Sequence, residues 1–491
     1  MSAITTRIKS SKALEKFILA AFVMMPIVML VLIAAEKYLG IAVIFVIAFI
    51  ILIIHNYKYG LYFIVVGLPL FQSISTRSDA ATTTGINLQY VLIPIVFVAW
   101  LSERLTRKTL SDTKLPFLSI FFLFVGALVI SIVHQLDVVS AQHIKHGIIQ
   151  IYALVNYLVL FYMIINEELA GKEIQRILWG FLIVTFIASI IGIYQYFTID
   201  VDQRTGMRIT SIFGSIFRTD TKSNPNDFGT YLAFMIMVAI FVWNTTTTRK
   251  NRIIIGIIIG VAFCALLLSF SRSSLLAAIF SILCYTFYRN KRAFFVTILV
   301  VILGLISLYF EPRFQSRINS IYQILTDKRI MNIFLAINPQ NLDWGYVEYY
   351  GIQGYGSDII SGAFRIWAWI QGVQLFWAHP FLGIGYHLTL AYSPWPTAEN
   401  LYLDFASMTG VVGLSLFLII QFIFLRDGFK LLKSPQHTHL GMLWLNILAV
   451  LFFVSLTGSI LFGGKLQGIF WILTGLFYNA KFKEDNRFYQ Q

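Results

Sequence analysis

The sequence predicts an all-α protein that crosses a membrane many times. Hydrophobic residues make up 58% of the 491 residues and charged residues only 12%, which is about half the charged share of a soluble globular protein. Long apolar runs recur along the whole chain, and about 20 apolar residues are enough for one membrane-spanning helix. The composition therefore excludes a water-soluble enzyme, a disordered chain and a small disulfide-bonded scaffold.

The apolar runs predict an integral membrane protein with about 12–14 transmembrane helices and a large extracytoplasmic loop. The first run follows four basic residues between Arg7 and Lys16 and has no small-residue cleavage site, so we expect an uncleaved first helix. In order, the expected spans cover about residues 17–35, 39–54, 61–74, 88–101, 116–133, 147–165, 176–197, 227–243, 252–270, 274–287, 294–309, 399–425, 440–461 and 466–479.

The net charge of +14 indicates orientation in a membrane rather than binding to nucleic acid. Basic residues gather in short turns between alternate spans, as in Arg104–Lys108, Arg249–Arg252 and Arg289–Arg292. Because cytoplasmic loops carry an excess of Lys and Arg, these turns predict a multi-pass protein with both termini in the cytoplasm. Basic residues confined to short turns also remove the main reason to expect a nucleic-acid partner.

Two long segments fall on the extracytoplasmic side, at about 198–226 and 310–398. Loops of this length are usually functional. The second contains Phe364–Trp377, whose tryptophans predict an amphipathic helix at the membrane interface, and then the turn-rich His379–Gly385. We divide the chain into N-terminal spans (1–197), a central region with both loops (198–430), and C-terminal spans with a cytoplasmic tail (431–491).

Charged side chains at the extracytoplasmic ends of spans are the candidates for catalysis, because charge in a membrane is costly and so usually functional. Arg272 stands in Ser271-Arg272-Ser273-Ser274, and Arg365 opens the Trp-rich helix; arginine binds phosphate through two parallel hydrogen bonds. Glu399 precedes a span and is a candidate general base. Ordinary alternatives are arginines directed at lipid headgroups and a carboxylate facing a helix dipole.

A second set of polar residues is expected to bind substrate in the same cavity. Asn400 and Asp404 share a helix face through their i,i+4 spacing. Asn226 belongs to Asn224-Pro225-Asn226-Asp227, which is also an ordinary helix-start pattern. The remaining members of this set are Arg208, Arg218 and His387. The sequence has no Cys/His spacing typical of a metal site, so no metal and no cofactor are predicted.

Together these segments resemble the O-antigen ligase and O-antigen polymerase family, which are bacterial multi-spanning glycosyltransferases with a large extracytoplasmic loop. The resemblance covers about residues 180–430, and its pieces occur in the family's order. They are Asn224–Asp227, Ser271–Ser273, Arg365-x-Trp367, His379–Gly385, and Glu399-Asn400 followed by Gly410–Leu414. The family typically has His where this chain has Glu399.

The resemblance implies glycosyl transfer at the outer face of the bacterial cytoplasmic membrane, without metal or cofactor. The donor is a glycan linked to undecaprenyl diphosphate and embedded in membrane lipid, and the acceptor is a sugar hydroxyl. Arg272 and Arg365 then stabilise the departing diphosphate, and Glu399 takes the acceptor proton, with inversion at the sugar carbon. This interpretation requires the three residues to face one cavity.

The replacement of His by Glu399 favours a polymerase of repeat units, as in capsule, exopolysaccharide, O-antigen or teichuronic acid synthesis; His387 is an alternative source of an imidazole. A ligase of the same family, which transfers a finished glycan, stays open. So does a lipid-linked oligosaccharide flippase or transporter, although transporters usually carry charges at mid-bilayer and here the charges lie at span ends. Flippase and chain-length regulator proteins are the expected partners.

Overall fold

The computed structural model describes residues 53, 56–70, 73–74, 86–87, 89–169, 171–198, 225–309, 315, 319, 326, 357–393, 397–434, 437–462 and 464–488. This part of the chain is almost entirely helical, so the predicted all-α class is confirmed. One short feature was not predicted: Ser73–Ile74 (β1) pairs antiparallel with Ile86–Asn87 (β2).

Each expected span within the described residues coincides with a helix, and the first two expected spans lie almost wholly outside those residues. The helices are α3 (Tyr57–Gly67), α4 (Gln89–Thr106), α5 (Leu118–Val133), α6 (Ala141–Asn166), α7 (Gly171–Thr198), α8 (Pro225–Thr245), α9 (Arg249–Leu268), α10 (Arg272–Arg289), α11 (Lys291–Tyr309), α15 (Ser357–Ala378), α16 (Leu401–Leu432), α17 (Thr438–Ser455) and α18 (Gly464–Phe488). Short 3-10 helices include η1 (Leu68–Leu70), η2 (Leu110–Asp112), η6 (Thr389–Ala391) and η7 (Ile460–Phe462).

Six of the described helices are long and apolar enough to cross a membrane: α6, α7, α8, α9, α16 and α17. The protein is therefore a multi-pass membrane protein, while the total of about 12–14 spans stays a prediction. Most helices extend a turn or more beyond the apolar run that predicted them, because capping and polar residues at the ends continue the helix. For example, α6 begins at Ala141 although its apolar run begins near residue 147.

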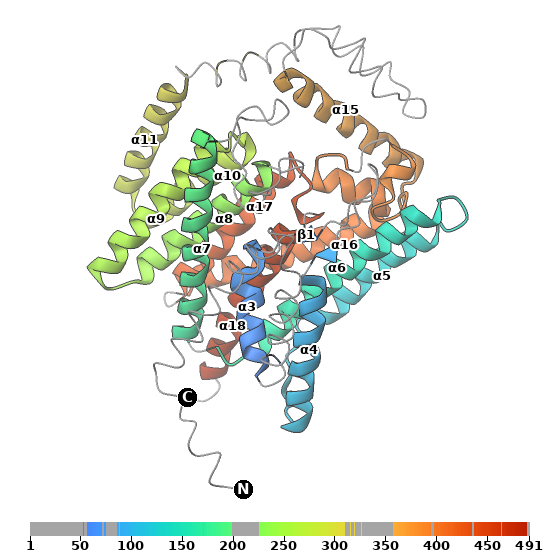
Figure 1. Ribbon diagram of the computed structural model, residues 1–491, viewed down its shortest axis with the longest axis horizontal. Coiled ribbons are helices and arrows are strands. Elements are labelled where there is room, and N and C mark those ends of the chain that lie inside the picture. The colour runs from blue at the N-terminus through green and yellow to red at the C-terminus, as the bar shows by residue number, and fades with distance from the viewer. Residues whose placement is uncertain are drawn as a thin grey trace.

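Short turns make consecutive helices antiparallel and give the bundle two distinct ends (Figure 1). At one end α6, α8, α10, α16 and α18 begin and α5, α9 and α17 end; this end carries the motifs noted above, and we call it the motif end. The opposite end holds the turns between α8 and α9, between α10 and α11, and between α16 and α17. We call it the basic end, because the turns there contain Arg249, Lys250, Arg252, Lys291, Arg292 and Lys433.

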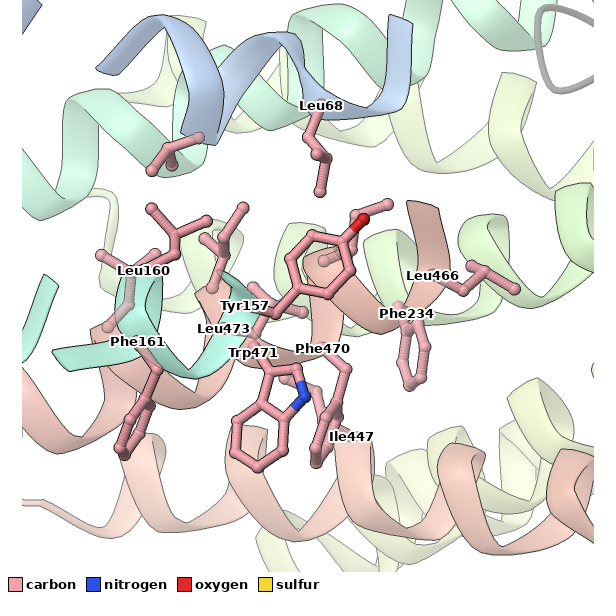
Figure 2. Close-up of a cluster of buried hydrophobic side chains, with 14 of the residues drawn as sticks. Leu68, Tyr157, Leu160, Phe161, Phe234, Ile447, Leu466, Phe470, Trp471 and Leu473 are labelled. Atoms are coloured by element: carbon pink, nitrogen blue, oxygen red, sulfur yellow. The ribbon is translucent and has the colours of Figure 1, made fainter. Parts of the chain in front are cut away.

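The centre of the bundle is filled by buried aromatic side chains, several of them from α6, α16, α17 and α18. Figure 2 shows Tyr157 and Phe161 of α6 near Phe470 and Trp471 of α18. Trp444 stacks on Phe477 with ring centroids 4.6 Å apart. The packing of α18 on α6 depends on a small residue, since a Cβ added at Gly468 would lie 2.6 Å from Tyr157 Cε1. Lipid tails are as apolar as these side chains, so close packing rather than the hydrophobic effect holds such helices together.

Buried carboxylates tie the helices together near the basic end. Asp427 on α16 is 3% exposed at its side chain and accepts hydrogen bonds from Tyr478 Oη at 3.0 Å and Lys481 Nζ at 2.8 Å, both on α18. Glu167, after α6, accepts from Tyr57 Oη at 2.7 Å and from Trp100 Nε1 at 3.1 Å. Each carboxylate therefore joins helices that are distant in sequence.

We predict that Asp427→Ala lowers the free energy of unfolding by on the order of 3 kcal/mol, because it leaves the buried Tyr478 hydroxyl and the half-buried Lys481 without their acceptor. The measurement is the thermal midpoint of the detergent-solubilised protein. The control is Glu103→Ala, which removes the more exposed i,i+4 pair with Arg107 and should change the stability by no more than about 0.5 kcal/mol. Equal shifts for both variants would contradict the role given to Asp427.

Candidate functional site

The first turn of α8 and the turn between α9 and α10 form one packed unit at the motif end. Phe270 has a left-handed backbone, with φ of 48°, which lets α9 turn directly into α10. A Cβ added at Gly229 would lie 2.7 Å from Ser271 Cβ, so only glycine allows this approach. Ser274 Oγ lies 2.8 Å from Ser271 Oγ and 3.2 Å from Thr230 Oγ1. The Asn226-Asp227 and Ser271–Ser274 motifs are thereby brought together.

Arg272 is the first residue of α10 and is half-buried beside this unit. Its neighbour Ser274 donates toward the carbonyl oxygen of Asn226 at 3.5 Å, so the α10 start and the α8 start are fixed relative to each other. Asn224, the first residue of the predicted motif, lies outside the described residues, as do Arg208 and Arg218.

The segment His379–Gly385, which follows α15 and which we call the glycine turn, is hydrogen-bonded to a break in α16. Gly410 interrupts α16 with φ of 63° and ψ of −165°, and the break leaves carbonyl groups without their helical partners. Ile384 N donates to Ser407 O and Gly385 N donates to Met408 O, both at 2.9 Å, and Val411 N donates to Pro380 O at 2.8 Å. Two of the predicted motifs, His379–Gly385 and Gly410–Leu414, are therefore two halves of one structure.

Glycine is required on both sides of this contact. Gly383 and Gly410 have positive φ angles of 69° and 63°, a conformation that costs an L-residue about 1–2 kcal/mol. A Cβ at Gly410 would lie 2.2 Å from the carbonyl carbon of Phe381, and a Cβ at Gly383 would lie 2.3 Å from that of Met408. Because both obstacles are backbone atoms, they cannot move aside as a flexible side chain can.

Glu399 lies in the turn directly before α16. Its φ of 52° is left-handed, and the residues around it hold that conformation. Asn400 is the N-cap: its Oδ1 accepts from Tyr402 N at 3.0 Å and Leu403 N at 3.1 Å, as expected for a capping side chain. Asp404 is fully buried, and its carboxylate accepts from Ala398 N at 2.5 Å and from the Ser459 hydroxyl.

The helix predicted over Phe364–Trp377 is confirmed as α15, and it packs against the Glu399 turn. Trp369 Nε1 donates to the Glu399 carbonyl at 3.5 Å. Gly372 lets the two segments approach, since its added Cβ would lie 2.9 Å from Ala398 Cβ. Arg365 is half-buried and precedes Trp369 by four residues, so both side chains lie on the same face of α15. Arg365 therefore lies one helical turn before Trp369, the residue that donates to the Glu399 carbonyl.

These residues, from α10 through α15 to the first half of α16, belong to a stretch with a known counterpart. Residues 257–418 match the O-antigen ligase family model. The resemblance to the O-antigen ligase and polymerase family is thereby confirmed over the stretch that contains Arg272, Arg365 and Glu399. No curated protein gives a match.

Charged groups from outside the O-antigen ligase domain also reach the Glu399 turn. The carboxylate of Asp227, in the first turn of α8, interacts electrostatically with Glu399 and with Lys465, in the first turn of α18. Asp404 also interacts with Glu399. The sequence interpretation missed Lys465, although the signal was the same as for Arg272: a lone cation directly before an apolar run.

His387 occupies a different part of the O-antigen ligase domain. It is buried, and its ring centroid lies 4.5 Å from that of Phe462 and 5.8 Å from that of His146 on α6. Burial, with a smaller contribution from His146, lowers the pKa of His387 to about 3. Its Nε2 has no hydrogen-bond partner among the described residues. His387 is therefore a neutral imidazole at physiological pH, packed between Phe462 and His146.

The expected sharing of one cavity by Arg272, Arg365 and Glu399 stays a prediction. What the structure brings together around Glu399 are Trp369 and the carboxylates of Asp227 and Asp404. Arg272 is the first residue of α10, and Arg365 lies one helical turn before Trp369 on α15. The polar atoms of Asn400 are occupied as well, since its Nδ2 donates to Leu456 O at 3.0 Å.

We predict that Gly410→Ala prevents the glycine turn from docking and lowers the stability by more than about 2 kcal/mol, from left-handed strain and overlap with backbone. The measurement is the thermal midpoint and the yield of monodisperse protein in detergent. Gly260→Ala on α9 is the matched control, because its Cβ would meet nothing within 4 Å and alanine favours a helix. A Gly410→Ala protein as stable as the control would refute this account.

Proposed function

We propose that this protein polymerises glycan repeat units carried on undecaprenyl diphosphate, at the outer face of the bacterial cytoplasmic membrane. The observation that carries the proposal is the O-antigen ligase domain folded so that Arg272, Arg365 and Glu399 lie at the motif end. Members of that family act on lipid-linked glycans in the membrane. A donor of this kind keeps its polyprenyl tail in the lipid while its diphosphate reaches the ends of the helices.

The distribution of charge supports an outward-facing site. The turns at the basic end contain Arg249, Lys250, Arg252, Lys291 and Arg292, whereas the motif end has fewer cations among the described residues, chiefly Lys145, Arg272, Arg365 and Lys465. Cytoplasmic loops are enriched in Lys and Arg, so the basic end faces the cytoplasm in this proposal. Both chain termini then lie in the cytoplasm.

The chemistry follows from the residue types. The acceptor hydroxyl oxygen attacks the anomeric carbon of the donor sugar and transfers its proton to the Glu399 carboxylate. The bond from that carbon to the diphosphate oxygen breaks on the opposite face, which inverts the configuration. Negative charge grows on the leaving diphosphate, and preorganised cations such as Arg272 and Arg365 lower the barrier to its departure.

Two other functions remain as competitors. A ligase that transfers a finished glycan from its lipid carrier is favoured by the description of the matching family model, O-antigen ligase. The presence of Glu399 where ligases have His favours the polymerase. A flippase would need charged groups along a central path, but Arg272, Lys465 and Asp227 lie in the first turns of their helices. Undecaprenyl-diphosphate-linked oligosaccharide is the proposed substrate, with flippase and chain-length regulator proteins as proposed partners.

We expect Glu399→Gln to cause lipid-linked single repeats to accumulate on the outer face of cells, because the acceptor hydroxyl has no base; a lost general base typically costs about 10²–10⁴-fold in rate. The measurement is glycan length and lipid-linked intermediates at matched protein levels. Glu168→Gln, at an exposed carboxylate near the basic end, is the control. Full-length glycan retained on its carrier would indicate a ligase, and single repeats trapped on the inner face a flippase.

We expect Arg272→Lys to lose about 10²-fold or more in transfer rate, since lysine keeps the charge but cannot form two parallel hydrogen bonds to a phosphate. The measurement is extension of a lipid-linked donor in proteoliposomes. Arg292→Lys makes the same exchange at an exposed position of the basic end and should have no effect. Equal activity of the two variants would exclude Arg272 as a diphosphate ligand.

A further inference from the structure

A small cavity lies beside the Glu399 turn, where α15, η6 and α16 meet. It is lined by α15 from Trp367 to Leu375, by Thr389 of η6, by Ala398 directly before Glu399, and by Ser407 of α16. The part that a water molecule can reach is about 10 Å³, which is close to the smallest volume that holds one water. The cavity therefore admits a single hydroxyl-sized group rather than a whole sugar ring.

The lining of the cavity is polar without being charged. Its polar residues are Gln371, Thr389, Ser393, Thr397 and Ser407, and no charged side chain lines it among the described residues. A phosphate or carboxylate that entered would lose its hydration without meeting an opposite charge, which is costly. A neutral hydroxyl can both donate to and accept from such side chains. The lining therefore fits one hydroxyl of a sugar better than any part of the diphosphate.

The hydroxyl of Thr389 indicates that the cavity takes a ligand group. Thr389 lines the cavity and is only 5% exposed, and its Oγ1 has no hydrogen-bond partner among the described residues. Buried hydroxyls are usually hydrogen-bonded, because an unpaired one costs free energy. The backbone of Thr389 is held in place, since its carbonyl accepts from Tyr392 N at 2.9 Å and from Ser393 N at 2.8 Å. A hydroxyl group in the cavity would supply the missing partner.

The wall that carries Thr389 is fixed to the end of α5. Tyr386 N donates to Ser131 Oγ at 3.1 Å. Tyr392 Oη donates at 2.5 Å to Oε1 of Gln135, which is buried just after α5. Because α5 precedes the O-antigen ligase domain in the chain, the N-terminal helices help to shape the cavity. A cavity that is formed before its ligand arrives costs little ordering on binding.

We propose that this cavity is a specificity subsite for the acceptor sugar: it receives one sugar hydroxyl, which Thr389 recognises. Ala398 lines the cavity and directly precedes Glu399, and Trp369 of α15 donates to the Glu399 carbonyl at 3.5 Å. A sugar with a hydroxyl in the cavity therefore lies beside the proposed general base. This inference rests on the proposed function. Such a subsite selects among sugars, because an analogue without the hydroxyl leaves buried polar groups unpaired.

The first test measures acceptor use in proteoliposomes, with the lipid-linked repeat unit extracted from Glu399→Gln cells as the substrate. Thr389→Val keeps the shape of the side chain but removes its hydroxyl, and should lower kcat/KM for the acceptor about tenfold, the contribution of one buried hydrogen bond. Thr389→Ser should stay within about threefold of the wild type, because it keeps the hydroxyl. Thr106→Val, which removes an exposed hydroxyl on α4, should match the wild type. A Thr389→Val protein that extends glycan at the wild-type rate would overturn the subsite and leave the proposed function standing.

The thermal midpoint separates sugar recognition from a structural role of the Thr389 hydroxyl. Because this hydroxyl is buried without a partner among the described residues, Thr389→Val should leave the midpoint of the detergent-solubilised protein unchanged or higher, as expected where a functional group costs stability. A lower midpoint together with lower activity would overturn the proposal, since the hydroxyl would then be needed for the fold.

Binding is tested without the reaction, in a detergent that has no sugar headgroup. The probes are the methyl glycosides of glucose, galactose and mannose. Sugars also stabilise proteins through exclusion from their surface, so the expected result is a difference between these stereoisomers in the shift of the thermal midpoint. Thr389→Val should abolish that difference and Thr106→Val should retain it. Equal shifts for all the glycosides, or the same difference in Thr389→Val, would overturn the proposal. Stereoselective binding by a wild type that never extends the donor would instead refute the proposed function and leave the sugar site standing.

Discussion

The arrangement of the site depends on how the break in α16 is filled. A break inside a membrane bundle leaves backbone groups that lipid cannot satisfy, and each such group costs roughly several kcal/mol in hydrocarbon. In α16 the freed carbonyls of Ser407 and Met408 accept hydrogen bonds from the N–H groups of Ile384 and Gly385. These hydrogen bonds therefore fix the glycine turn against the break in α16. Because α15 precedes that turn and Glu399 precedes α16, the same contact sets the position of both.

This dependence explains why the sequence predicted the helices and the two glycine motifs but not the hydrogen bonds that join those motifs. Apolar runs predicted the spans well, since length and hydropathy suffice for a membrane helix, and the tryptophans predicted α15. The sequence around Gly410 did not predict a break, because the apolar pattern continues through it and glycine is common in transmembrane helices. The two glycine motifs appeared as independent weak signals, and only the fold shows that one completes the hydrogen bonds of the other.

Side-chain roles were harder to predict than helices. Asn400 and Asp404 were expected to bind substrate from their shared face, but a sequence cannot show that their polar atoms are occupied by Leu456, Ser459 and the backbone of the Glu399 turn. Lys465 was missed because it lies beyond the family-like motifs and reaches the site only through the packing of α18 against α6 and α8. Long-range electrostatic neighbours of this kind depend on tertiary structure, which spacing along the chain does not encode.

The helix starts at the motif end also differ in a way that supports separate roles for them. A helix N-terminus favours anions through its unpaired N–H groups and its dipole. At α16 those groups are taken by Asn400 Oδ1, which accepts from Tyr402 N and Leu403 N. At α10 the capping residue Ser271 makes no side-chain bond to the helix start, its hydroxyl being engaged with Ser274 instead. In the proposed reaction, the start of α10, with Arg272 on it, is therefore better suited to the diphosphate. The capped start of α16 is better suited to holding the proposed carboxylate base, Glu399, in a fixed direction.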